Sequence, residues 1–120
     1  MVELLIVISI IGILATVAIP LLLTSRRHAL DEKARQSVRV VLSAEQSFYA
    51  THGRYGGLDE LAGADPPFLD ERFITGEGIM GNAMVITLTV GGGSSFDVYA
   101  DNPQGFHDYE ADEEMDITEL

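Results

Sequence analysis

The feature that most constrains this chain is an uninterrupted apolar run near its start. Residues 4 to 23, LLIVISIIGILATVAIPLLL, carry no charged side chain. In a helix, about 20 such residues rise about 30 Å, which matches the hydrocarbon thickness of a bilayer. A soluble domain of 120 residues rarely has such a core helix, and a secretory signal normally has a shorter apolar stretch behind a basic segment. The run therefore predicts a helix that must find apolar partners in lipid or in copies of itself.

The rest of the composition argues against several classes of function. The chain has 7 Lys and Arg residues against 19 Asp and Glu and a formal charge of -12, and its basic residues form no patch interleaved with aromatic side chains. Nucleic-acid binding is therefore not expected. The absence of cysteine excludes thiolate catalysis, Cys-ligated zinc, iron–sulfur clusters and disulfides. The three histidines share no metal-ligand spacing, and no serine lies in a nucleophile-elbow context. We expect neither enzymatic activity nor a cofactor.

Helical signals continue beyond the apolar run. Residues 24 to 52 contain no Gly or Pro, and their apolar side chains form a stripe along one helix face. The stripe consists of Leu30, Ala34, Val38, Val41, Leu42, Ala44, Phe48 and Tyr49. Asp31, Arg35 and Arg39 follow one another at i, i+4 spacing, which suits a solvated polar face. Gly53 is the expected stop, so the helix should reach about 75 Å in length.

Residues beyond the helix predict a loop and then an antiparallel sheet. Residues 53 to 73 are rich in Gly, Pro and Asp, which indicates a connecting loop with one helical turn at residues 58 to 62. The following segments alternate apolar and polar side chains around tight turns, and such a meander has an apolar face that can cover the helix stripe. The expected strands are residues 83 to 90 and 96 to 100, with weaker ones at 106 to 110 and 115 to 118.

The predicted fold class is therefore α+β. A long N-terminal helix protrudes with its apolar half, and its amphipathic half packs on a small antiparallel β-meander. The expected segments are the apolar helix 1–23, the amphipathic helix half 24–52, a connecting loop 53–82, and a sheet with an acidic C-terminal segment 83–120.

The opening MVELLIVISIIGILATVAIP resembles the N-terminal helix of type IV pilins and of the related pseudopilins of type II secretion. The family pattern has a glutamate just inside the apolar run, then a glycine and a helix-breaking proline, which here are Glu3, Gly12 and Pro20. AEQSFYATHGRYGGLDELA is similar to the helix end and loop entry of small bacterial pilins, and AMVITLTVGGGSSFDVYA is similar to their first hairpin. The resemblance implies a lollipop-shaped subunit whose long helix carries a four-stranded antiparallel sheet.

The resemblance also implies a structural role. Prepilin peptidase processes such subunits, which wait in the inner membrane until the pilus assembly machinery builds them into an extracellular helical filament of identical subunits. Glu3 would then face the N-terminal amine of a neighbouring subunit, and the segment from Gly12 to Pro20 would loosen when helices crowd. Proline also removes a backbone donor, which predicts a bend or local unwinding just before Pro20. The side chains expected in the filament core are Leu4, Leu5, Ile6, Val7, Ile8, Ile10, Ile11, Ile13, Leu14, Val17 and Ile19.

Two alternatives remain open from the sequence. A type II secretion pseudopilin would form a short periplasmic pseudopilus, and a single-pass anchored binding module would not polymerise. Family precursors carry a basic leader that is cut before a residue four positions ahead of the glutamate, and that residue becomes N-methylated. Only Met1 and Val2 precede Glu3, while Arg26 and Arg27 follow the apolar run, which opposes the usual charge bias for this orientation. We therefore expect the natural chain to begin upstream.

Two further motifs allow a chemical interpretation. GEGIMG, residues 76 to 81, fits the GxGxxG pattern, but a strand pattern follows it instead of a helix, so a loop is the better interpretation. Residues 108 to 119 carry seven acidic groups and no basic one. A solvated acidic surface is the favoured interpretation of this segment. Calcium binding, which some pseudopilins show in the equivalent loop, is the alternative, with Asp108, Asp112, Glu114 and Asp116 as the candidate ligands.

Overall fold

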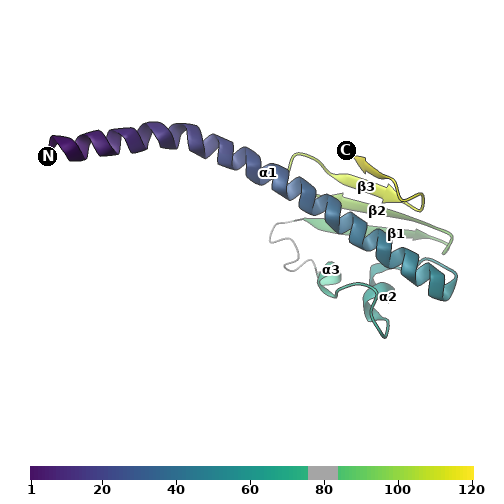
Figure 1. Cartoon of the computed structure of the whole chain (residues 1–120). Helices are drawn as coiled ribbons and strands as arrows, with labels where there is room; N and C mark the ends of the chain where they lie inside the picture. Colours follow the sequence, from purple (N-terminus) through teal and green to yellow (C-terminus); the bar gives the residue numbers. More distant parts are fainter. Residues whose placement is uncertain (76–83) are drawn as a thin grey trace.

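The computed structural model describes residues 1–75 and 84–120. A single long helix precedes everything else, and the sheet lies beside the second half of this helix (Figure 1). The GxGxxG motif at residues 76 to 81 lies outside the described residues. The elements are α1 (Val2–His52), α2 (Leu58–Gly63), α3 (Arg72–Thr75), β1 (Val85–Gly91), β2 (Ser95–Asp101), β3 (Tyr109–Asp112) and β4 (Ile117–Glu119).

Helix α1 sets the length of the molecule. It has 51 residues, and the molecule measures 74 × 27 × 18 Å. It ends at Gly53, whose φ of 71° is left-handed and whose N–H donates to the carbonyl of Tyr49 at 2.8 Å, as expected for a glycine cap. The helix stays α-helical through Pro20, so the local unwinding expected there is absent. Its first half curves gently (Figure 1), and a bend located just before Pro20 stays a prediction.

The four strands form an antiparallel meander in the order β1-β2-β3-β4. Leu88 on β1 pairs with Val98 on β2, Val98 pairs with Ala111 on β3, and Ala111 pairs with Ile117 on β4. Directly opposite residues share a face, so these four side chains form an apolar row across the sheet. The first hairpin and its alternation are confirmed. The third strand begins at Tyr109 instead of the expected residue 106, because residues 102–107 form a loop that is bound to α1.

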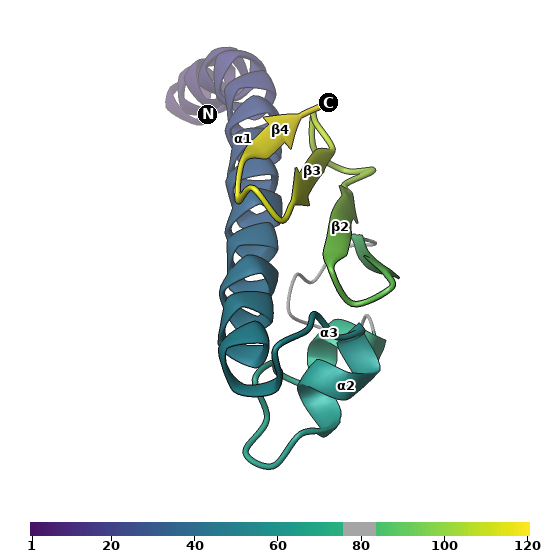
Figure 2. The ribbon, with the colours of Figure 1, turned by 90° about the vertical axis from the view of Figure 1, so that its right-hand side faces the viewer.

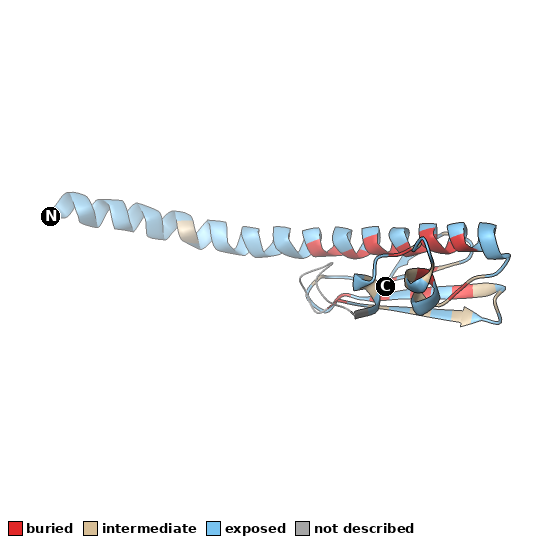
Figure 3. Ribbon diagram, turned by 90° about the horizontal axis from the view of Figure 1, so that it is seen from below, coloured by how far each residue is buried: buried red, intermediate tan, exposed pale blue. Residues whose placement is uncertain are grey.

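One hydrophobic core lies between the second half of α1 and the sheet (Figures 2 and 3). Seven of the eight expected stripe residues are buried, whereas Tyr49 remains 46% exposed. Leu61 of α2 and Leu69 of the following loop belong to the same core. The buried core residues of the sheet are Phe96, Val98, Ala100, Tyr109 and Ala111. The predicted α+β lollipop is therefore confirmed.

Candidate functional site

The first half of α1 exposes its apolar side chains on every side. Among the described residues, α1 is the one helix that is long and apolar enough to cross a membrane. None of its most apolar stretch is buried. All eleven side chains expected in a filament core are between 52% and 70% exposed. Burying one such side chain fully stabilises by about 1.5–3 kcal/mol. A helix that is apolar all round is not stable in water, so this surface must be covered by lipid or by other chains.

Glu3 is the one charged side chain in the first 25 residues. Its Oε2 atom lies 3.7 Å from the terminal amine of Met1, and both groups are almost fully exposed. An exposed ion pair of this kind adds little to the stability of a single chain. At the edge of an apolar environment the same carboxylate is costly unless it has a cationic partner. Glu3 is therefore suited to pair with an amine wherever α1 becomes covered, and its pairing between chains stays a prediction.

Gly12 and Pro20 both weaken α1 without serving the packing of this chain. A Cβ atom added at Gly12 would meet no atom within 4 Å, so nothing inside the chain requires glycine there. Glycine in a helix interior costs about 0.5–1 kcal/mol relative to alanine, and proline costs more. A role of Gly12 in close approach to another helix or in the flexibility of α1 stays a prediction.

Asp31 fastens the β2–β3 loop to α1. It is only 6% exposed, and its Oδ1 atom accepts hydrogen bonds from Asn102 Nδ2 at 3.0 Å, Phe106 N at 2.8 Å and His107 N at 3.2 Å. Asp108 braces the same loop by accepting from Asn102 N at 2.8 Å. Hydrogen bonds to a charged acceptor are stronger than neutral ones. The interpretation of Asp31 as part of a solvated face was therefore wrong.

Glu45 is a fully buried carboxyl group near the end of α1. Its Oε2 atom accepts a hydrogen bond from Gly56 N at 3.1 Å, whereas Oε1 has no partner within the described residues. Burial raises the pKa of this carboxyl, and the bond from Gly56 only partly opposes that shift. Gly56 leaves no room for a side chain, since a Cβ atom there would lie 2.8 Å from Phe48 Cε1. Through this hydrogen bond, Glu45 attaches the turn at Gly56, which follows α1, to the helix.

Sequence reasoning missed the roles of both acidic residues, although the pattern contains a signal. Glu45 lies three residues after Leu42 and three before Phe48, which places it inside the apolar stripe. Asp31 likewise lies three residues before Ala34. A carboxylate within an apolar stripe indicates a buried, hydrogen-bonded acid.

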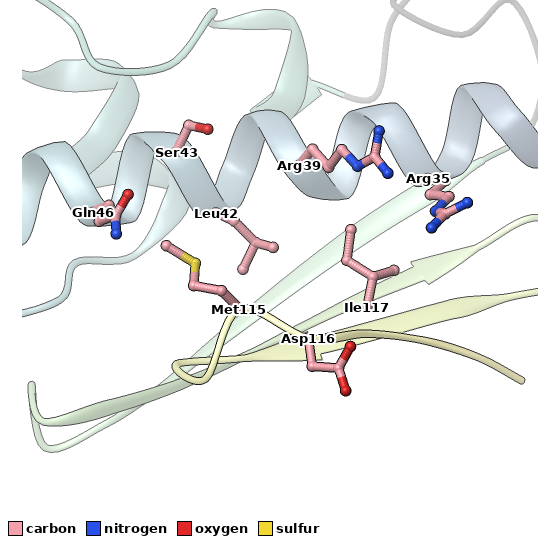
Figure 4. Close-up of a pocket in the computed structure, with 8 residues that line it drawn as sticks. All are labelled: Arg35, Arg39, Leu42, Ser43, Gln46, Met115, Asp116 and Ile117. Carbon is pink, nitrogen blue, oxygen red and sulfur yellow. The ribbon is translucent and has the colours of Figure 1, made fainter.

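A shallow groove runs between α1 and the turn that joins β3 to β4. Its volume is about 520 Å³, and its lining includes Arg35 and Arg39 of α1. Figure 4 shows Met115 and Ile117 pointing toward α1 between these arginines and Gln46. Within residues 1–75 and 84–120, neither arginine forms an ion pair. The groove therefore brings two arginines of α1 and Asp116 of the β3–β4 connection to the same depression.

The acidic C-terminal segment is divided between a loop and two strands. The two oxygens of Asp108 accept hydrogen bonds from the Tyr99 hydroxyl at 2.9 Å and from a backbone N–H at 2.8 Å. Asp112 and Asp116 line one small depression of about 230 Å³, which Asp108 and Glu114 do not line. In the part of the chain that the structure describes, no group of three His, Cys, Asp or Glu residues is placed to hold a metal ion. Calcium binding stays a prediction.

Comparison with known proteins gives one informative similarity. No family model matches the chain. It is 32% identical, over 66 residues, to the type IV major pilin protein PilA of Myxococcus xanthus strain DK1622. The match covers 55% of this chain and 30% of the length of that relative. Together with the long apolar helix and the α+β lollipop, this similarity supports a pilin-like structural role.

Proposed function

We propose that this chain is a structural subunit of a type IV pilus. It spans the inner membrane once through the first half of α1 and then polymerises through the same surface into an extracellular filament. The observation that carries the proposal is that fifteen large apolar side chains are more than half exposed on one half of a helix. The other half of that helix is already committed to its own core, so the exposed half is left for lipid or for neighbouring subunits.

The energetics of assembly explain why a few residues should matter more than overall apolarity. Lipid tails are as apolar as leucine, so replacing lipid by protein around α1 brings no net hydrophobic gain. Specific contacts must then favour the filament. Glu3, paired with the terminal amine of a neighbouring subunit, supplies one such contact and sets the axial register. Gly12 supplies another, because its missing side chain lets helices approach closely.

We assign one role to each segment, in the order of the segments along the chain. Residues 1–23 form the membrane anchor and later the filament core, and residues 24–52 carry the sheet. Residues 53–82 connect the two, and residues 83–120 coat the outside. At low salt the formal charge of -12 would keep neighbouring filaments apart. Processing by a prepilin peptidase and extrusion by a pilus assembly machinery belong to the same proposal.

The proposal is tested by shearing surface filaments from the source cells and identifying the subunit by tandem mass spectrometry. Cells that carry the native chain are compared with cells that carry Glu3→Ala and with a matched control, Glu32→Ala, which removes an exposed carboxylate from the solvated part of α1. We expect the native chain and the control in the sheared fraction, with Glu3→Ala strongly depleted there. An N-methylated residue ahead of Glu3 would further support a processed pilin.

Other outcomes distinguish the alternatives. If the chain stays in the cell envelope but forms short fibres that depend on Glu3, the chain is a type II secretion pseudopilin and not a pilus subunit. If the chain stays in the envelope and Glu3→Ala has no effect on it, an anchored module that does not polymerise is the correct description. Each of these results would contradict the proposal.

A further inference from the structure

The positive charge of this chain is concentrated next to its apolar half. Five of the seven Lys and Arg residues lie between Arg26 and Arg39. The other two, Arg54 and Arg72, pair with carboxylates at 2.8 Å and 2.9 Å. In the described part of the chain, Arg26 and Arg27 have no ion pair, although they are the first charged residues after the apolar run.

An aromatic ring lies beside these arginines. The connection between β2 and β3 reaches α1 at the end of the sheet nearest the protruding half of the helix (Figure 1). There Phe106 lies with its ring centroid 5.3 Å from Arg27 Cζ and 5.0 Å from the His28 ring centroid. Phe106 nevertheless remains 44% exposed. Its backbone N–H donates to buried Asp31 at 2.8 Å, so the backbone that carries the ring is fixed beside α1.

Arg26 and Arg27 lie at the position along α1 where a membrane interface would be. If residues 4 to 23 fill the hydrocarbon layer, a rise of 1.5 Å per residue places Arg26 and Arg27 about 5–6 Å beyond its edge. The headgroup region extends roughly that far on each side of the hydrocarbon. Arginine is well suited to bind phosphate there, and an exposed aromatic ring is favoured at the boundary between headgroups and acyl chains.

We propose that Arg26, Arg27 and Phe106 form a membrane-contact surface that seats the folded head directly on the bilayer before assembly. The two arginines bind lipid phosphates, and the Phe106 ring lies at the boundary between headgroups and acyl chains. The inference rests on the proposed anchoring of α1 in a membrane and adds a second, lateral contact to it. Removal of a subunit from the membrane then breaks this contact as well as extracting the helix.

The absence of tryptophan from the chain makes the proposal directly measurable. The full chain is reconstituted into vesicles of phosphatidylethanolamine and phosphatidylglycerol, with and without lipids brominated near the headgroup end of their acyl chains. Phe106→Trp reports on the contact surface. Tyr49→Trp is the matched control, because Tyr49 is 46% exposed at the far end of α1. Leu14→Trp lies near the middle of the hydrocarbon layer, so it is measured with lipids brominated near the methyl end of their acyl chains and reports insertion of the apolar half.

We expect the brominated lipids to remove most of the fluorescence of the Phe106→Trp variant, shift its emission to the blue, and leave the Tyr49→Trp variant unaffected. If Leu14→Trp is quenched while Phe106→Trp behaves like Tyr49→Trp, the inference is wrong and the anchoring of α1 stands. If Leu14→Trp is also unaffected, the anchoring fails together with the inference.

The role of the arginines has a separate readout. Arg26→Gln with Arg27→Gln, combined with Phe106→Trp, should lower the quenching by brominated lipid. The matched control combines Phe106→Trp with Arg35→Gln and Arg39→Gln, which removes two charges from a more distant part of α1 and should leave the quenching unchanged. Equal quenching in the two combinations would overturn the proposal that lipid phosphates bind Arg26 and Arg27.

Discussion

Replacing Asp31 by alanine should release the β2–β3 loop from α1 and destabilise the whole head. The carboxylate accepts three hydrogen bonds on a single oxygen, and its donors are Asn102 Nδ2, Phe106 N and His107 N. No other contact in the described structure joins this loop to α1 through a buried charge. The perturbation therefore removes the polar attachment between two segments that are more than 70 residues apart in sequence.

The size of the expected loss in the free energy of unfolding depends on which donors can form hydrogen bonds with water once the Asp31 carboxylate is removed. A hydrogen bond to a charged acceptor contributes about 1.5–3 kcal/mol, but such contributions do not add fully. The backbone N–H groups belong to Phe106 and His107, which are exposed and can be rehydrated, whereas Asn102 is 4% exposed. Asn102 Nδ2 also keeps a bond to the His107 carbonyl at 3.2 Å. We expect Asp31→Ala to lower the free energy of unfolding by ~3–4 kcal/mol and Asp31→Asn, which keeps an acceptor, by ~1–2 kcal/mol.

Urea unfolding of the full chain in detergent micelles measures this loss. The chain contains four tyrosines and no tryptophan, and buried Tyr109 makes tyrosine fluorescence a probe of the sheet. Glu32→Ala is the matched control, since Glu32 is the exposed neighbour of Asp31. Hydrogen exchange adds a local readout, because the amides of Phe106 and His107 should exchange faster in Asp31→Ala before global unfolding.

Gly105 provides an independent check on the same network. A Cβ atom there would overlap the Asn102 amide and the Asp31 carboxylate, so Gly105→Ala should also destabilise the head. Because both changes act on one network, their combined effect should be smaller than the sum of the two. If Asp31→Ala costs less than about 1 kcal/mol, as surface substitutions do, the argument that Asp31 secures the loop is refuted.

Three further predictions concern other parts of the chain. Burial raises the pKa of Glu45 above its ordinary value of 4.5, so the folded state binds its proton more tightly than the unfolded state does. The stability that this provides is complete below the unfolded pKa and is lost as the pH rises through the folded pKa. Urea unfolding between about pH 4 and pH 7 should therefore show less pH dependence in Glu45→Gln, with Glu32→Gln as control; an unchanged profile would contradict the assignment. Gly12→Leu should reduce the yield of sheared filaments more than membrane insertion, because Gly12 has no steric role within the chain; normal filaments would exclude a role in close helix packing or flexibility. Deletion of residues 1–23 should give a soluble monomer by light scattering, and persistent aggregation would show that the sheet does not cover the stripe.

Much of the fold was predictable because its signals are local. Gly53 ends α1 since a glycine accommodates the left-handed cap, and the apolar spacing before it identifies the helix face that packs on the sheet. The alternation after residue 84 likewise predicts the first hairpin and its buried face. Each of these inferences depends on residues only a few positions apart.

The candidate site was predictable to different degrees along the chain. The apolar side chains of α1 and the position of Glu3 follow from the sequence, and their exposure in the structure is consistent with contacts outside the chain. The contact between Arg27 and Phe106 was not predictable, because the ring belongs to a loop that lies 75 residues after Asp31 in the sequence. Periodicity along α1 contains no information about which distant loop returns to it.

The order of residues is enough to establish that one half of a long helix is apolar on all sides and that the other half has one face for a small antiparallel sheet. These properties arise from the order of neighbouring side chains, which local backbone geometry converts into faces. The spacing of Asp31 and Glu45 places both carboxylates within the apolar face, but the long-range fold alone supplies the groups that bind them there. Their hydrogen-bond donors come from residues 71 to 76 positions later for Asp31 and 11 positions later for Glu45. A carboxylate can be buried where such donors compensate its lost hydration, and the fold brings them there.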